Sequence, residues 1–135
     1  MYRVLNMNRL HLTLVGMAVT LLVGCAQKQE ESLKVKVTVT NTGSVEGDEV
    51  VQLYAHDELA SVARPMKQLV AFKRITLAPG ESCEVELEVP YRQFGLWDRE
   101  MHFGVEEGWF ELWLGRNANE RITGGRTYVA ARGDK

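Results

Sequence analysis

The stretch CEVELEV, residues 83–89, decides the fold of this 135-residue chain. Its apolar residues occupy every second position and alternate with three glutamates, and the side chains of a β-strand point alternately to opposite faces. The stretch is therefore predicted to be a strand with one buried face and one face in water. Ala78-Pro79-Gly80-Glu81 precedes it, and Pro followed by Gly at the two central positions fits a type II turn. Pro90 is predicted to end the strand.

The same alternation opens the body of the chain. In LKVKVTVT, residues 33–40, Leu and Val alternate with Lys and Thr, and the turn-forming residues NTGS, 41–44, follow directly. The next predicted strand, Asp48–Ala55, either pairs with the first strand or faces it across a sandwich. Further extended stretches are predicted at Leu69–Leu77, Trp109–Gly115 and Ile122–Val129, with a loop over Tyr91–Met101.

About seven short strands, with no helical periodicity after residue 25, predict an all-β protein. An immunoglobulin-like β-sandwich is favoured, and an all-β barrel of similar size is the alternative. The length allows one domain and one core. The Cys…Trp…Cys spacing of antibody domains is absent from the sequence, which argues against that branch of the class.

The N-terminal segment 1–24 is predicted to be a signal peptide, with a signal helix ahead of the sandwich. Its apolar run, residues 10–24, follows Arg3 and Arg9 and has the length of a signal-peptide core, whereas a membrane-spanning helix needs about 20 residues. Leu22-Val23-Gly24-Cys25 resembles the lipobox of bacterial lipoproteins, in which the signal is cut before a cysteine that receives lipid. The alternative is a short uncleaved membrane anchor.

This interpretation assigns lipidation to Cys25 and a polar tether to residues 25–32. The predicted domain then covers 33–129, and 130–135 form a polar tail. Ala26 stands where many Gram-negative bacteria place Asp to retain a lipoprotein in the inner membrane, so a lipid-anchored position at the outer membrane of the cell envelope is expected. With Cys25 consumed by lipid, Cys83 has no disulfide partner and is expected to be a small buried hydrophobe.

The segment Val37–Val89 closely resembles the C-terminal fibronectin type III-like domain of family 3 glycoside hydrolases, the β-glucosidases and β-xylosidases. The motifs that carry the resemblance are NTG at 41–43, GDEVVQLY at 47–54, Arg64-Pro65 with Lys67 and Leu69, FKR at 72–74 and LAPGE at 77–81. LWD at 96–98, Gly108, FEL at 110–112 and Gly115 extend it to about residues 33–129. The chain departs from the family pattern at Gln68, at Val70-Ala71 and at Glu107.

The resemblance implies a non-catalytic accessory or structural module of such a glycosidase system. The family's catalytic aspartate and its general acid/base belong to preceding domains, so no catalytic residue is carried over and no enzyme activity is expected. The first 32 residues look like the start of an exported enzyme and the rest like its end, which suggests a truncated remnant of such an enzyme. A lectin-like, envelope-anchored carbohydrate-binding module is the alternative function.

Two sets of candidate binding residues follow. Arg64, Pro65 and Lys67 lie in a loop too long for a tight hairpin, and we expect them to contact glycoside hydrolase catalytic domains or a second copy of the chain. Trp109 and Trp113 are four residues apart in a predicted strand, so they share one face, where they could stack on a sugar. The alternative is that both pack at the sandwich edge or beneath the 91–101 loop against Trp97.

Other chemistries are not indicated. After residue 24 the chain has 14 basic and 18 acidic side chains, hence a charge of −4, and no basic cluster for nucleic acid. The histidines are not spaced as metal ligands, so no metal and no cofactor are predicted. Three pairs of neighbouring acids exist, but loop acids are usually solvated and unperturbed. These pairs are Asp57 with Glu58, Asp98 with Glu100, and Glu106 with Glu107.

Overall fold

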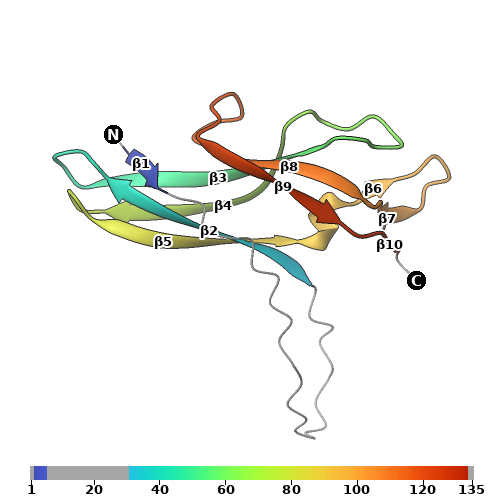
Figure 1. Ribbon diagram of the computed structural model, residues 1–135, viewed down its shortest axis with the longest axis horizontal. Coiled ribbons are helices and arrows are strands. Elements are labelled where there is room, and N and C mark those ends of the chain that lie inside the picture. Colours follow the sequence, from blue (N-terminus) through green and yellow to red (C-terminus); the bar gives the residue numbers. More distant parts are fainter. Residues whose placement is uncertain (1, 6–30, 134–135) are drawn as a thin grey trace, which may run out of the picture.

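A computed structural model describes residues 2–5 and 31–133 of the chain (Figure 1). The described residues form ten strands and one 3-10 helix, and the predicted all-β class is confirmed. The six long strands are β2 (Ser32–Asn41), β3 (Gly47–Asp57), β4 (Gln68–Leu77), β5 (Ser82–Pro90), β8 (Gly108–Gly115) and β9 (Thr123–Val129). The short elements are β1 (Tyr2–Leu5), η1 (Tyr91–Phe94), β6 (Leu96–Trp97), β7 (Phe103–Val105) and β10 (Arg132–Gly133).

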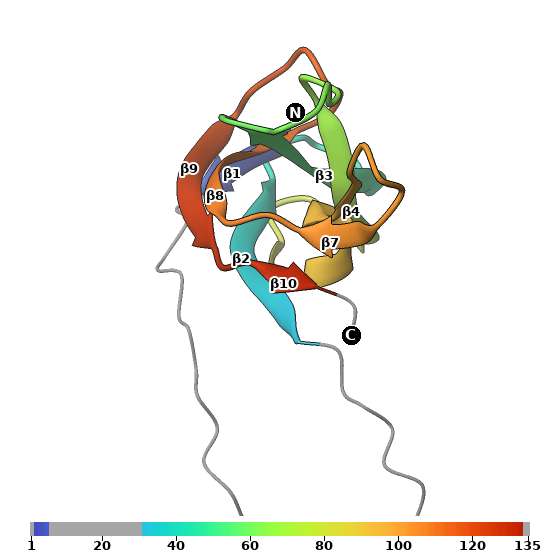
Figure 2. The ribbon, with the colours of Figure 1, turned by 90° about the vertical axis from the view of Figure 1, so that its right-hand side faces the viewer.

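Two sheets form the sandwich. One has the order β1-β2-β5 and the other β4-β3-β8-β9, with all pairings antiparallel. The first two predicted strands therefore face each other across the sandwich and do not pair. A small third sheet, β10-β7-β6, lies at the end of the sandwich that faces the viewer in Figure 2.

The core forms where the alternating strands of the two sheets meet. From β2 and β5 it receives Leu33, Val35, Val37, Val39, Val85, Leu87 and Val89, which are the apolar positions of the two quoted stretches. The opposite sheet contributes Leu53, Phe110, Leu112 and Leu114 among others. Each fully buried Val or Leu side chain contributes about 1.5–3 kcal/mol relative to exposure, so this face-to-face burial drives folding. Phe94 of η1 closes one end of the core, with its ring centroid 4.9 Å from that of Phe110.

The predicted turn before β5 is confirmed. Gly80 has a φ of 75°, and the Glu81 amide donates to the Ala78 carbonyl at 3.0 Å. The turn is tied to the end of β2, because the Gly80 amide donates to the Asn41 carbonyl. Asn41 is itself buried, and its amide nitrogen donates to the carbonyls of Val45 and Leu77. The NTG motif therefore joins the β2–β3 and β4–β5 turns.

Several sequence-based boundaries differ from the structure. The loop predicted over 91–101 contains η1 and β6, and β6 pairs with β7. Pro90 is the last residue of β5 and lies opposite Ser32, so the strand ends at this proline as the sequence predicts. The predicted signal helix and Cys25 lie outside the described residues, except that Tyr2–Leu5 form β1 beside β2.

Candidate binding surfaces

The loop between β3 and β4 is held from inside by Arg64. Its guanidinium donates to Asp57 Oδ2 at 3.0 Å and to the Phe94 carbonyl at 2.9 Å. Two further acceptors are Gln68 Oε1 and the Gly95 carbonyl. The side chains of Arg64 and Asp57 are 10% and 5% exposed, and the guanidinium lies 5.5 Å from the centre of the Phe110 ring. Arg64 therefore anchors the loop to the end of the core, and these hydrogen bonds of its guanidinium go to acceptors of the domain itself.

The structure reduces the residues predicted to contact a partner from three to two. Pro65 and Lys67 are exposed, whereas the Arg64 side chain is enclosed. Lys67 Nζ donates to Asn119 Oδ1 at 2.6 Å, which joins this loop to the loop between β8 and β9. A direct contact with a partner stays a prediction for Pro65 and Lys67, while Arg64 supports the loop from beneath.

An apolar edge continues from this loop along β4. Met66, Leu69 and Phe72 are 68%, 44% and 67% exposed, and we call these three residues the docking edge. Among the strands of the described residues, β4 pairs with β3 alone, and β5 in the opposite sheet pairs with β2 alone. Exposed apolar side chains beside an unpaired strand edge are a feature of surfaces that bind another protein.

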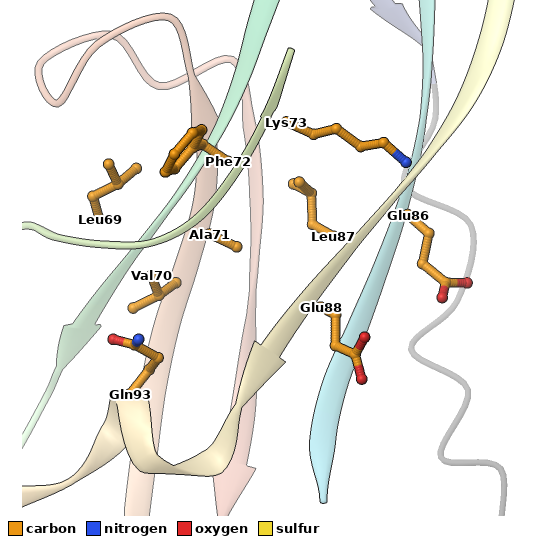
Figure 3. A pocket seen from close by; sticks show the side chains of 9 residues that line it. All are labelled: Leu69, Val70, Ala71, Phe72, Lys73, Glu86, Leu87, Glu88 and Gln93. Atoms are coloured by element: carbon orange, nitrogen blue, oxygen red, sulfur yellow. The ribbon is translucent and has the colours of Figure 1, made fainter. Parts of the chain in front are cut away.

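A hollow of about 280 Å³ separates β4 from β5 beside the docking edge (Figure 3). It is lined by Leu69, Val70, Ala71, Phe72, Lys73, Glu86, Leu87, Glu88 and Gln93. Figure 3 shows Leu69 and Phe72 on the β4 side and the two glutamates on the β5 side. The lining also includes Lys73 on the β4 side and Leu87 on the β5 side, so both walls carry apolar and charged side chains.

The two candidate tryptophans share the outer face of β8, as their spacing predicts, but only one is open. Trp113 is 6% exposed because Tyr54 stacks on it, with ring centroids 5.7 Å apart, and Arg121 lies 5.5 Å from its ring. Trp109 is 48% exposed. The alternative packing against Trp97 is not observed, since Trp97 packs on Phe103. The proposed stacking on sugar therefore needs correction at Trp113, whose faces are covered.

Sequence reasoning missed the partners of these tryptophans. Tyr54 lies opposite Trp113 in the β3–β8 pair, and Tyr128 lies opposite Trp109 in the β8–β9 pair. Alternation shows which side chains share a face of one strand, but it does not give the register between strands. Only the register brings these aromatic side chains together.

Acids of the three candidate pairs form hydrogen bonds with different partner residues. Glu58 accepts from Arg126 at 2.6 Å, and Glu106 accepts from the Ser61 amide at 3.1 Å. The Asp98 carboxylate accepts from the amides of His102 and Glu100, and the bond from His102 is the main reason why the pKa of Asp98 is lowered. Asp57 binds Arg64 instead of facing Glu58.

Among the described residues, four carboxyl groups have a displaced pKa, and in each the pKa is lowered. For Asp48 the chief cause is the Thr76 hydroxyl, for Glu86 the Lys34 ammonium and for Glu111 the Arg121 guanidinium. Asp98 is the fourth. A glycosidase general acid needs a raised pKa, so these four groups have the opposite electrostatic environment.

Residues 2–5 and 31–133 contain no group of three His, Cys, Asp or Glu side chains placed to hold a metal ion. Nor does this part of the chain contain a helix able to cross a membrane. Cys83 is a free thiol, half-buried against the core, in agreement with its predicted packing role.

Comparison with known proteins identifies the family to which the sandwich belongs. Residues 49–118, just over half of the chain, match the model of the fibronectin type III-like domain. The chain belongs to this family. The matched region contains β4, β5, β8 and all of β3 except its first two residues, so the Fn3-like match covers most of the four-stranded sheet and β5 of the opposite sheet.

Relatives of the Fn3-like domain are parts of longer enzymes. A beta-xylosidase of Formosa agariphila is 44% identical over 84 residues, which cover 62% of this chain and 12% of that protein. A periplasmic beta-glucosidase of Salmonella typhimurium is 38% identical over 88 residues, covering 65% of this chain and 12% of that enzyme. The chain thus spans about an eighth of the length of these curated relatives, and it matches their C-terminal region.

Solved structures of two beta-glucosidases also match this chain. Beta-glucosidase 3B of Thermotoga neapolitana matches with a TM-score of 0.77 and 27% identity over the whole of this chain and 17% of that one. A beta-glucosidase of Listeria innocua matches with a TM-score of 0.70 and 31% identity, over 75% of this chain and 14% of that one. The Fn3-like domain therefore corresponds to a non-catalytic part of these enzymes.

Proposed function

We propose that this chain is a non-catalytic accessory module of a family 3 glycoside hydrolase system and that it packs against the catalytic domains of such an enzyme. The observation that carries the proposal is the match of residues 49–118 to a domain that β-glucosidases and β-xylosidases carry beside the rest of their chains. The docking edge supplies the contact, because moving its apolar side chains out of water is favourable.

The surface chemistry supports this choice of contact. On the outer face of β2 and β5, Lys34 and Lys36 form ion pairs with Glu84 and Glu86, so these charges are already paired within the sheet. Covering that face would remove hydration from several charges without giving them new partners. Covering Met66, Leu69 and Phe72 removes apolar area from water instead.

The experiment uses the catalytic part of a family 3 β-glucosidase from which its own Fn3-like domain has been deleted. We expect the chain to bind this part, and Phe72→Ser to weaken binding at least tenfold in biolayer interferometry. Val45→Ser is the matched control, because Val45 is an exposed apolar residue in the turn between β2 and β3. No binding by the wild-type chain, or equal losses for both variants, would contradict the proposal.

Attachment to the outer membrane through lipid on Cys25 is part of the same proposal. Two acyl chains are the usual minimum for stable anchoring, and the polar residues 26–32 would hold the domain within roughly 15 Å of the bilayer. We expect metabolic labelling with palmitate to mark the wild-type protein and not Cys25→Ser. Labelling that survives this substitution would remove the lipoprotein assignment and leave the docking proposal untouched.

The hypothesis that the chain is a remnant of a longer enzyme also stays a prediction. The relatives carry nearly nine-tenths of their length outside the matched segment. DNA sequence on both sides of the gene would test it, since a remnant predicts catalytic-domain coding sequence nearby in a displaced frame.

A further inference from the structure

Trp109 and Tyr128 form an exposed pair on the outer face of the four-stranded sheet, and we call them the aromatic corner. They lie opposite each other on β8 and β9. Their ring centroids are 5.5 Å apart and their planes meet at 71°, so the rings form a corner and do not stack. Trp109 is 48% and Tyr128 51% exposed, which leaves part of each ring open to a ligand.

Polar side chains surround the corner. The Arg126 guanidinium lies over the Trp109 ring, 5.0 Å from its centre, and donates to Glu58 Oε2 at 2.6 Å, so a ligand would use the part of the ring that stays exposed. Partial desolvation, and then the charge of the Glu107 carboxylate and a hydrogen bond to it, raise the pKa of the Tyr128 hydroxyl. The corner thus combines two ring surfaces with guanidinium, carboxylate and hydroxyl groups.

This combination differs from the docking edge in the ligand that it suits. Met66, Leu69 and Phe72 are apolar throughout, which suits another protein surface. A glucose or xylose ring with equatorial hydroxyls has an apolar C–H face and a polar rim. Its C–H face can lie on an aromatic ring while its hydroxyls bond to charged side chains, and charge-assisted hydrogen bonds of this kind are stronger than neutral ones.

We propose that the aromatic corner binds glucose or xylose units of a β-linked oligosaccharide, with Trp109 as the stacking residue and Tyr128, Arg126 and Glu58 as polar contacts. The site is separate from the docking edge and does not require a partner enzyme. It replaces the stacking surface expected from Trp109 and Trp113, because Tyr54 and Arg121 cover Trp113.

Titration of the whole chain with cellohexaose and xylohexaose, followed by NMR chemical shifts, tests the proposal. We expect shifts in Trp109, Tyr128 and Arg126, and Trp109→Ala should weaken binding at least tenfold. Trp97→Ala is the matched control, since Trp97 is also exposed but packs on Phe103 away from the corner. It should bind as the wild type does.

Two further readouts complete the test. Tyr128→Phe removes only the hydroxyl, so a smaller loss of affinity with unchanged thermal unfolding supports the polar contact. Absence of shifts with both oligosaccharides, or equal losses in Trp109→Ala and Trp97→Ala, would overturn the proposal. Loss of binding to catalytic domains in Trp109→Ala, with no oligosaccharide binding in the wild type, would assign the corner to protein contact and overturn it too.

Discussion

The two outer faces of the sandwich use the same strand geometry for different surfaces. On the β2–β5 face, Lys34 and Lys36 of β2 form ion pairs with Glu86 and Glu84 of β5, and Ser and Thr side chains lie at the two ends of this charged run. On the β3–β8–β9 face, arginines lie over aromatic rings: Arg121 over Trp113 and Arg126 over Trp109. We refer to these as the charged face and the aromatic face.

The difference shows where the domain can form contacts. The charged face is satisfied within itself and remains favourably hydrated, so it gains little from a partner. The aromatic face and the adjoining docking edge leave ring and aliphatic surface in water. Exposed apolar surface of this kind usually marks a binding site, so function is expected on that side of the molecule.

The largest effect is expected from Trp113→Ala on the aromatic face. Removing this buried ring also removes its stacking on Tyr54, so we expect the free energy of unfolding to fall by about 3–5 kcal/mol in urea denaturation. Trp97→Ala, at an exposed position, should cost less than about 1 kcal/mol. Similar costs for both would show that the aromatic face is not packed as described.

Arg64→Met should follow, with a loss of about 3 kcal/mol. The substitution leaves the Asp57 carboxylate, which is 5% exposed, without its cation. Removing one partner of a buried ion pair costs about 3–5 kcal/mol. The lower end is expected because the Arg64 side chain keeps some exposure. Asp57→Asn combined with Arg64→Met should recover part of the loss, and a double variant as unstable as the sum of the single variants would contradict this role.

A smaller, pH-dependent effect is expected from Glu111→Gln on the aromatic face. Arg121 lowers the pKa of Glu111 below its ordinary value of 4.5, so the folded state binds this proton more weakly than the unfolded chain. Its contribution is present above that ordinary value and is lost as the pH falls through the lowered pKa of the folded state. Urea midpoints of the wild type and the variant should differ at pH 7 and converge at pH 3; a constant difference would refute the linkage.

The smallest effect is expected on the charged face, from Glu86→Gln. Lys34 lowers the pKa of Glu86, but both side chains are well exposed, and exposed ion pairs contribute little. We expect the thermal midpoint at pH 7 to stay within experimental error of the wild type. A clear fall would show that the charged face stabilises the domain more than its exposure indicates.

Alternation along single strands was enough to predict the all-β class and the buried residues of β2 and β5. It also placed Trp109 and Trp113 on one face, because both depend only on period two. It could not show that Trp113 is covered or that Tyr128 stands beside Trp109, since those contacts depend on pairing register.

The loop residues were harder to interpret from sequence. Arg64 is a charged residue in a long loop, and such residues are usually exposed, yet it lies against Phe110 with Asp57 as its counter-charge. The pairing joins the end of β3 to the loop that follows it, a contact that no local pattern encodes. The short strands β6 and β7 were missed because two or three residues are too few for a periodic signal.

The most direct test of the account is hydrogen–deuterium exchange of the chain alone and with the catalytic part of a family 3 β-glucosidase. The account predicts slower exchange in the complex across residues 66–74, the docking edge and its strand, and unchanged exchange across residues 33–40 of the charged face. Protection of 33–40 with none at 66–74 would contradict it.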